Sequence, residues 1–407
     1  MKNIKNMNKL FLLILTLGVM ASCTLNDDPE ATVDCYTCEN LTTEYCYTDG
    51  EEFYTSTVNN EVTEVLLNGQ TWEEIKVTLE NNCTGSLGDY ALGYFIINEG
   101  NFGSGIGTLS FVGNDGNVTQ DIYQTVNSEP IGNALQSMYI YNDKAYLVVN
   151  NSQKIIVVNR YTMEKLATIE GSDINNPRYF VAVGNKGYIS NWGDATDPND
   201  DFITVINLET NAVESTITVA EGPEDMLIND DKLYVNLQGG FSQNNQVVII
   251  DTANDSVLSS LTVGDVPNSI TVDKNNDIWV LCSGVPSWTG AETAGRLVRI
   301  KNDEVFVNFD FEMTEHPEHL AINTVKDVFY YNLNGKVYSQ SIVTAAPFEE
   351  VAGFDGFYYG MTIKDDKLYT LNAGNFTSEG TLKIFNLNTS ETQTITTGII
   401  PNSVVFQ

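Results

Sequence analysis

Histidine and basic residues are scarce in this chain of 407 residues. It has 2 His, and 20 Lys+Arg stand against 54 Asp+Glu, which gives a formal net charge of −34 at pH 7. A surface of this sign repels nucleic-acid phosphates and no basic stripe offsets it, so nucleic acid is excluded as a partner. With two His, no Ser-His-Asp grouping is apparent either. The acidity instead favours solubility and cationic or neutral ligands.

Long apolar runs are absent except near the N-terminus. Residues 10–21 (LFLLILTLGVMA) follow three Lys and are too short to span a bilayer, which is typical of an export signal. M-A-S-C then ends at Cys23 and resembles a bacterial lipobox, with Met20 in place of the usual Leu. We expect residues 1–22 to be a lipoprotein signal peptide and Cys23 to be lipidated; an ordinary secretory signal is the alternative.

The linker that follows the lipidated cysteine, residues 23–33, is acidic from its start. Its T-L-N-D-D-P-E looks like the surface-export signal of Bacteroidota lipoproteins, and no Asp directly follows Cys23. The expected location is therefore the outer membrane, where the protein is held by a lipid anchor and faces the cell exterior.

Cysteine is confined almost entirely to the first 90 residues. Apart from Cys23, the chain has the isolated Cys282, expected to be a buried thiol, and a cluster in a small module at 34–86: Cys35, Cys38, Cys46 and Cys83. In an exported protein this even set predicts two disulfides, with three connectivities open. A zinc site is the alternative, but no His or second C-x-x-C accompanies C-Y-T-C. A short helix is expected near residues 71–81.

From residue 91 onward, short β runs alternate with Asn/Asp/Gly turns and repeat one theme. K-A-Y-L-V-V-N (144–150), K-L-Y-V-N (232–236) and K-L-Y-T-L-N (367–372) are three copies of it. A second theme, Pro-x-polar-apolar, recurs every 41 to 50 residues, with these residues at its third position: Ser137, Tyr179, Asp225, Ser269, His319, Gly360 and Ser403. Repeats of this length with four short strands each predict a β-propeller.

Residues 91–407 contain seven such repeats, six of them complete. The first lacks its innermost strand, and P-N-S-V-V-F-Q at the C-terminus matches the missing piece. The predicted fold is therefore all-β: a seven-bladed β-propeller closed by the C-terminal strand, preceded by the small disulfide-bearing N-terminal module. A β-sandwich would not need this period, and a solenoid would not need the closing strand. No W-D or G-H signature of WD-type repeats is present.

The Pro-x-Ser-apolar, Tyr-Val-x-Asn and Val-x-Ile-Asp themes resemble those of YVTN/YncE-like propellers. The longer phrases F-I-I-N-E-G-N-F-G, V-V-N-N-S-Q-K-I-I-V-V-N and I-W-V-L-C are similar to a Bacteroidota surface-lipoprotein branch of that group, which includes the BtuG type. The resemblance covers residues 91–407. It implies a protein that captures a corrinoid (cobalamin-like) ligand at the cell surface and passes it to a TonB-dependent outer-membrane transporter. No short ligand-defining motif can be carried over residue by residue.

Long, irregular loops join the second and third strands of the repeats, whereas the other turns are short. Long loops on a rigid scaffold usually carry function. They are rich in Asn, Gln, Gly, Trp and Phe, which suits a large neutral ligand such as a corrinoid, and nearly as well a glycan. The predicted ligand-binding residues in these loops are Asn101, Phe102, Trp192, Gln238, Trp288, Asn375 and Phe376. Those predicted at the mouth of the central channel are Arg178, His319 and Tyr359.

No catalytic residue and no resident cofactor or metal is predicted. The alternatives to corrinoid binding are a glycan-binding or adhesion propeller and a calcium-dependent lactonase-like hydrolase, which would need carboxylates such as Glu224, Asp225 and Glu318 to converge. The acidic loop 194–201 is a candidate for structural calcium, although a solvated loop is the commoner outcome. The Asn that ends most second strands, such as Asn98, is predicted to be structural because so many repeats share it.

Overall fold

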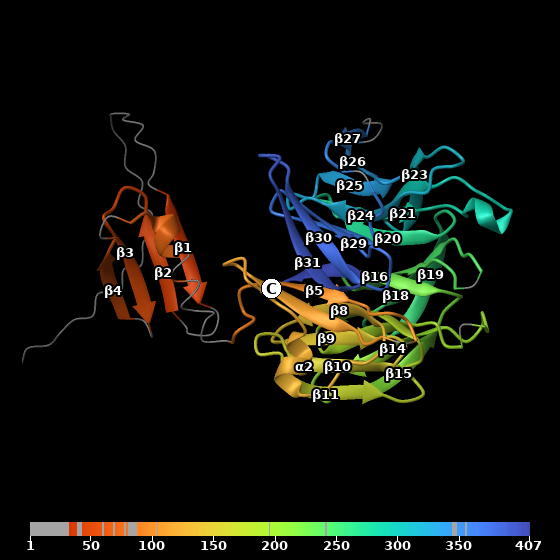
Figure 1. Cartoon of the computed structure of the whole chain (residues 1–407), viewed down its shortest axis with the longest axis horizontal. Helices are drawn as coiled ribbons and strands as arrows, with labels where there is room; N and C mark the ends of the chain where they lie inside the picture. The colour runs from red at the N-terminus through yellow and green to blue at the C-terminus, as the bar shows by residue number, and fades with distance from the viewer. Residues whose placement is uncertain are drawn as a thin grey trace, which may run out of the picture. The chain divides into compact units, whose positions relative to one another are not determined.

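The computed structural model of the chain describes residues 32–38, 43–58, 61–67, 70–76, 79, 88–103, 105–194, 196–240, 242–343, 348–354 and 356–407. The chain divides into two compact units, residues 1–83 and 84–407 (Figure 1). The predicted signal peptide, Cys23 and most of the predicted linker lie outside the described residues. In the described part, no helix is long and apolar enough to cross a membrane.

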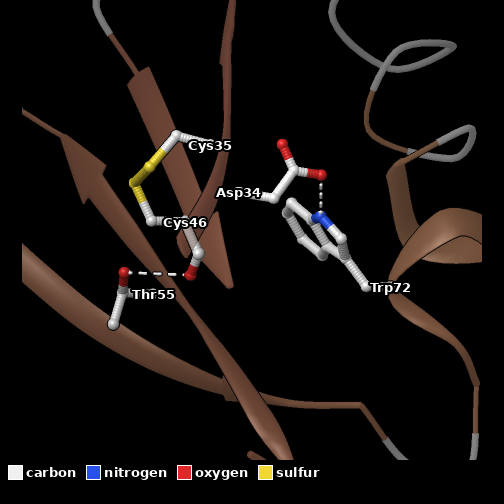
Figure 2. Close-up of a disulfide and its surroundings, with 5 residues drawn as sticks. All are labelled: Asp34, Cys35, Cys46, Thr55 and Trp72. Carbon is white, nitrogen blue, oxygen red and sulfur yellow. Dashed lines mark hydrogen bonds between the residues drawn. A yellow bond between two sulfur atoms is a disulfide. The ribbon is translucent and has the colours of Figure 1, made fainter. Parts of the chain in front are cut away.

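The first unit is built on one four-stranded antiparallel sheet. Its strands lie in chain order: β1 (Val33–Cys38), β2 (Thr43–Thr48), β3 (Phe53–Val58) and β4 (Glu61–Leu66). Residues 72–76 are helical, within the predicted range. Trp72 is buried with Tyr54 and Leu67 in the core of this unit, and its indole N–H donates to the Asp34 carboxylate at 2.8 Å (Figure 2).

A disulfide joins Cys35 to Cys46, which lie directly opposite each other on β1 and β2 (Figure 2). It confirms one of the two predicted disulfides and settles the partner of each of these cysteines. The side chain of Cys38 and all of Cys83 fall outside the described residues. Cys35 and Cys46 also lie near Glu44, but sulfurs consumed by a disulfide are not available as zinc ligands.

The described residues of the second unit form seven four-stranded antiparallel sheets. Sheets 1 to 4 consist of β32 (Pro401–Phe406), β5 (Gly93–Asn98), β6 (Thr108–Gly113) and β7 (Val118–Thr119); β8 (Leu135–Tyr141), β9 (Lys144–Val149), β10 (Lys154–Asn159) and β11 (Lys165–Glu170); β12 (Pro177–Val183), β13 (Lys186–Asn191), β14 (Phe202–Asn207) and β15 (Ala212–Thr218); and β16 (Pro223–Asn229), β17 (Lys232–Leu237), β18 (Gln246–Asp251) and β19 (Ser256–Thr262).

Sheets 5 to 7 consist of β20 (Pro267–Val272), β21 (Ile278–Cys282), β22 (Arg296–Lys301) and β23 (Glu304–Asp310); β24 (Glu318–Ile322), β25 (Val328–Leu333), β26 (Lys336–Ser341) and β27 (Glu349–Val351); and β28 (Gly360–Lys364), β29 (Lys367–Asn372), β30 (Glu379–Asn386) and β31 (Thr392–Ile399). A short helix, α2 (Ile122–Asn127), lies between sheets 1 and 2, and a 3-10 turn, η1 (Ser287–Thr289), lies in sheet 5.

The second and third strands of most sheets are largely buried, because neighbouring sheets cover them; β26 and β30 are buried less completely. β9 and β13 are buried at five of their six positions, which explains why these strands read as nearly continuous apolar runs. Between sheets 2 and 3, for example, the rings of Tyr146 and Phe180 stack with their centroids 4.2 Å apart. The fourth strands, such as β15, are mostly exposed.

The first strands of the seven sheets contact one another in cyclic order: β8, β12, β16, β20, β24, β28 and β32, which returns to β8. β32 pairs with β5, with Pro401 opposite Asn98, as the sequence predicts. In Figure 1 the C-terminus lies beside the orange β5. The fold is thus β-propeller-like, and the pairing covers sheet edges that the two ends of this unit would otherwise expose.

Cys282 and Gly360 are two buried positions in this unit. Cys282 is a free, fully buried cysteine, as predicted, and burial raises the pKa of its thiol. Gly360, at the start of β28, packs directly against the backbone of β32: an added Cβ would collide with the carbonyl oxygen of Asn402 and lie 3.1 Å from Leu371. The contact between sheets 7 and 1 therefore depends on the absence of a side chain at Gly360.

Candidate ligand-binding face

The loops between second and third strands and the links between sheets lie at the same end of the sheets, because the four strands of each sheet form an antiparallel meander. We call this end the loop face. Among the described residues, six large hydrophobic side chains are exposed on it: Phe102, Ile106, Trp288, Met313, Phe357 and Phe376. Several exposed apolar side chains on one face are a feature of binding surfaces rather than of ordinary protein surface.

Three of the loop-face rings form a group that we call the aromatic cluster: Phe357, Tyr359 and Phe376. Their centroids are 5.5–6.3 Å apart. The Asn101 amide donates to the carbonyl oxygen of Phe376 at 3.0 Å, which joins the loops of sheets 1 and 7 across 275 residues of sequence. The structure therefore brings together three predicted ligand-binding residues, Asn101, Tyr359 and Phe376. A fourth, Phe102, follows Asn101 in the chain and is 70% exposed.

Asn375, also predicted to bind ligand, is used by its own loop. Its side-chain oxygen accepts hydrogen bonds from the backbone N–H and the hydroxyl of both Thr377 and Ser378, at 2.9–3.0 Å. This is the turn-forming role that Asn often takes. The geometry assigns Asn375 to shaping the loop that presents Phe376.

A second part of the loop face is a pocket of about 300 Å³ between the loops of sheets 4 and 5 and the link to sheet 6. Its wall includes Gln238 and Trp288, both predicted ligand-binding residues, and also His316 and Glu318. Trp288, at 80% exposed, stands at the rim. The pocket involves sheets 4 and 5 and Glu318 of sheet 6, whereas the aromatic cluster involves sheet 7 and the link before it, so the predicted residues are divided between two parts of the loop face.

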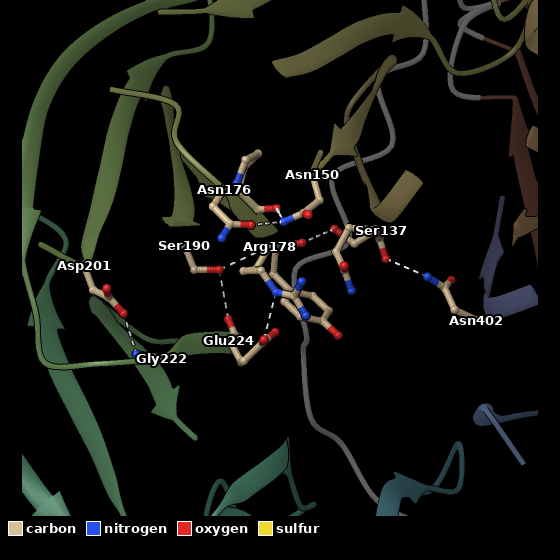
Figure 3. Close-up of polar contacts among 12 residues, drawn as sticks. Ser137, Asn150, Asn176, Arg178, Ser190, Asp201, Gly222, Glu224 and Asn402 are labelled. Carbon is tan, nitrogen blue, oxygen red and sulfur yellow. Dashed lines mark hydrogen bonds and ion pairs between the residues drawn. The ribbon is translucent and has the colours of Figure 1, made fainter. Parts of the chain in front are cut away.

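Charged side chains also lie on the first strands β12 and β16, which contact each other in the ring of first strands; we call the centre of this ring the channel. The Arg178 Nε donates to the Glu224 carboxylate at 2.8 Å (Figure 3), and the guanidinium lies over the Trp192 ring, 4.4 Å from its centroid. Arg178 and Trp192 were both predicted to contact ligand, and the structure places them together. The Trp192 indole N–H is buried and has no hydrogen-bond partner among the described residues.

Glu99 is a member of this channel that the sequence did not single out. Its carboxylate accepts from the Asn402 amide at 2.9 Å and from the Tyr359 hydroxyl at 3.1 Å. Burial raises the pKa of Glu99, against the opposing effect of these hydrogen bonds. The available signal was its position, directly after the strand residue Asn98 in the phrase I-N-E-G-N-F-G.

Burial also shifts the pKa of other groups in the channel. It raises the pKa of Glu224, with Arg178 opposing the shift, and raises the pKa of Asp225 to about 7. The same cause lowers the pKa of His319, which makes its neutral form the dominant one at pH 7. Asp225 therefore carries less than a full negative charge near pH 7.

The described residues do not bring carboxylates together as a metal site would. The one group of three potential ligand side chains within 4.8 Å of one another is that of Cys35, Glu44 and Cys46, so Glu224, Asp225 and Glu318 do not converge to that spacing. In the acidic loop 194–201, Asp194 and Asp197 each accept hydrogen bonds from a nearby residue of the same loop.

The Asn residues that end the second strands have a structural role at the positions whose side-chain hydrogen bonds are described. Asn98 and Asn191 each donate to the carbonyl oxygen two residues earlier, and to hydroxyls on the neighbouring strand. This agrees with the structural interpretation of the repeat. Asn236 differs: it is fully buried, and neither atom of its amide has a partner among the described residues. Nothing in the structure explains the difference.

Together, the fold and the loop face define a propeller-type protein whose exposed aromatic side chains gather at one end. Residues 92–395 match the family described as Domain of unknown function (DUF5074), and the chain belongs to that family. No curated protein sequence is detectably similar to it.

Solved structures of propeller type are similar to the chain in fold. A hypothetical selenium-binding protein from Sulfolobus tokodaii has a TM-score of 0.58 and 10% identity, over 78% of this chain and 93% of its own. A candidate 6-phosphogluconolactonase from Bacteroides fragilis has a TM-score of 0.56 and 12% identity, over 77% and 98%. Hydrazine synthase from Kuenenia stuttgartiensis has a TM-score of 0.51 and 13% identity, over 72% of this chain and 90% of its own. At these identities the likeness concerns the fold alone.

Proposed function

We propose that this protein is a surface-exposed lipoprotein that binds a corrinoid and passes it to a TonB-dependent outer-membrane transporter. In this proposal the seven sheets are the seven blades of a closed propeller of the YVTN/YncE-like type, and the loop face is the binding surface. The protein acts as a binding module and catalyses no reaction.

The observation that carries the proposal is the placement of exposed aromatic side chains in two parts of the loop face. The aromatic cluster lies on sheets 6 to 7 and the Trp288 pocket on sheets 4 and 5, with Arg178 and Trp192 on sheet 3. Two separated apolar contacts suit a ligand broad enough to bridge the channel mouth. A corrinoid has a broad ring with apolar faces and a rim of amide groups, which matches flat aromatic contacts and polar donors.

Calorimetric titration with cyanocobalamin tests this proposal. Binding with a dissociation constant of about 1 μM or tighter is expected. Phe376→Ala should weaken it by about tenfold, because it removes the central ring of the aromatic cluster. The matched control is Phe306→Ala: Phe306 has similar exposure, 43% against 38% for Phe376, but lies on the outer strand β23. Absence of heat with cyanocobalamin, or equal effects of the two substitutions, would contradict the assigned site.

The lipid anchor is a separate part of the proposal and rests on the sequence alone. Cys23→Ala should abolish lipid attachment, so that metabolically incorporated labelled palmitate no longer appears on the protein and the protein leaves the membrane fraction. Protease added to intact cells should degrade the unsubstituted protein if it faces the exterior. Unchanged membrane association of the Cys23→Ala variant would rule out this anchor.

A further inference from the structure

The two histidines of the chain lie three residues apart but have different surroundings. Both ring nitrogens of His316 are engaged: Nδ1 lies 2.8 Å from the carbonyl oxygen of Ser283, and Nε2 lies 3.2 Å from the Glu292 carboxylate. His316 thereby ties the Trp288 loop to the link before sheet 6. It has no ring nitrogen left for a ligand.

His319 uses one ring nitrogen only. Its Nε2 contacts the carbonyl oxygen of Tyr358 at 3.2 Å, and since a carbonyl oxygen only accepts, Nε2 carries the proton. The Glu318 carboxylate also lies on the Nε2 side, at 3.9 Å. Nδ1 then holds a lone pair, and no described residue donates to it. The side chain is 27% exposed, so this nitrogen belongs to a ring that is partly accessible from the channel.

The backbone at His319 differs from that at the first strands of five other sheets; sheet 7 does not share their pattern either. In sheets 2 to 5 and sheet 1, the residue before the first strand has positive φ: Ala134, Asn176, Gly222, Val266 and Ile400, with φ of 55° to 78°. In sheet 6 the positive φ, 60°, falls on His319, the second residue of the first strand β24, and not on the residue before that strand. A non-glycine residue in the left-handed region costs free energy, and such positions cluster at functional sites.

A single nitrogen donor is too little to hold a free metal ion, which needs several protein ligands. It is sufficient for a metal that arrives inside its own macrocycle, because the ring supplies the in-plane nitrogens and leaves only an axial position open. The described residues of this unit show the matching combination: one imidazole with a ring nitrogen that no described residue engages, exposed aromatic rings on the same loop face, and no cluster of three metal-ligating side chains.

We propose that Nδ1 of His319 is an axial ligand to the cobalt of the bound corrinoid. This rests on the proposed function and deepens it. The step is a ligand exchange: the Nδ1 lone pair forms a bond to cobalt(III), the bond from cobalt to its axial water breaks, and the water leaves. The oxidation state of cobalt does not change. The protein therefore distinguishes corrinoids with an exchangeable axial position from those whose axial positions are both capped.

Visible absorption spectroscopy tests this directly. Diaquocobinamide, whose axial positions hold exchangeable water, is expected to show a shift of its absorption bands when the protein is added, of the kind that free imidazole produces. Dicyanocobinamide, with both positions capped, is expected to bind without that shift. His319→Asn should abolish the shift, since Asn tolerates positive φ but its amide is a poor ligand for cobalt(III). His316→Gln should retain the shift, whatever the affinity of this variant for diaquocobinamide.

The outcomes separate the two proposals. A shift that is lost in His319→Asn but present in His316→Gln supports axial ligation, and an affinity for diaquocobinamide that falls about tenfold in His319→Asn while that for dicyanocobinamide is unchanged supports it further. Calorimetric binding of both cobinamides with no shift overturns the role of His319 and leaves corrinoid binding intact. Absence of binding to either cobinamide and to cyanocobalamin overturns the proposed function, and axial ligation with it.

Discussion

Replacing Arg178 with methionine is expected to lower the free energy of unfolding by about 3–5 kcal/mol. Methionine keeps an aliphatic stem over the Trp192 ring but removes the charge that pairs with Glu224. The side chains of this pair are 18% and 5% exposed, so the remaining carboxylate cannot recover its hydration. Breaking a buried ion pair from one side is costly because an uncompensated charge stays behind. Urea-induced unfolding at pH 8 measures the loss.

The double variant Arg178→Met with Glu224→Gln is the matched control. It removes both charges, and we expect it to recover at least half of the lost stability, since the neutral amide is less costly to bury. At pH 5 the single variant should lose less than at pH 8, because burial already raises the pKa of Glu224 and without Arg178 the carboxyl group can take up a proton. If the single variant is as stable as the original protein, or the double variant is no more stable than the single one, then an unpaired Glu224 charge does not destabilise the fold.

Gly360→Ala is expected to cost about 3 kcal/mol or more, the upper part of the range for overpacking. The new methyl group would meet the carbonyl oxygen of Asn402, which is backbone of the adjacent first strand and cannot rotate away as a side chain can. β28 and β32 would have to separate. Asn402 also donates to Glu99 and to the carbonyl oxygen of Gln136, so the displacement would reach sheets 1 and 2. Thermal and urea unfolding both report this effect.

Gly240→Ala is the comparison that separates crowding from the general cost of adding a methyl group. An added Cβ at Gly240 would have its nearest neighbour at 3.4 Å, a carboxylate oxygen at the end of the Glu221 side chain, which can move. Its effect should stay within about 0.5 kcal/mol. Similar losses of stability for both substitutions would mean that the close approach of β28 and β32 is not the reason why Gly360→Ala is destabilising.

The strands of the propeller unit could be predicted from the sequence because their signals are local. Pro177, Pro223, Pro267 and Pro401 each begin a first strand, a position where proline's missing N–H is tolerated. The closing strand was predictable for a different reason: the first repeat lacks one strand and the end of the sequence supplies a match. Counting the strands in each repeat was therefore enough to predict that β32 pairs with β5.

The site was less predictable because its contacts join distant segments. Glu99 and Tyr359 meet across 260 residues, so the position of Glu99 after Asn98 does not by itself reveal this contact. Phe357 was overlooked because it lies in a link between sheets rather than in a long loop. Asn375 was chosen for its residue type, but whether an Asn faces a ligand or folds its own loop depends on the hydroxyls beside it, here those of Thr377 and Ser378.

The pairing of β32 with β5 also governs the order in which this protein can fold. Closing a segment of roughly 300 residues costs about 5 kcal/mol of chain entropy, which the contacts of sheet 1 must offset when its two parts meet. Sheets 2 to 7 each come from a continuous stretch and can form earlier. If the chain is exported as proposed, sheet 1 stays a three-stranded fragment until residues 401–406 arrive. The ring then remains open until the last residues of the chain have crossed the membrane, and the loop face is complete only after that.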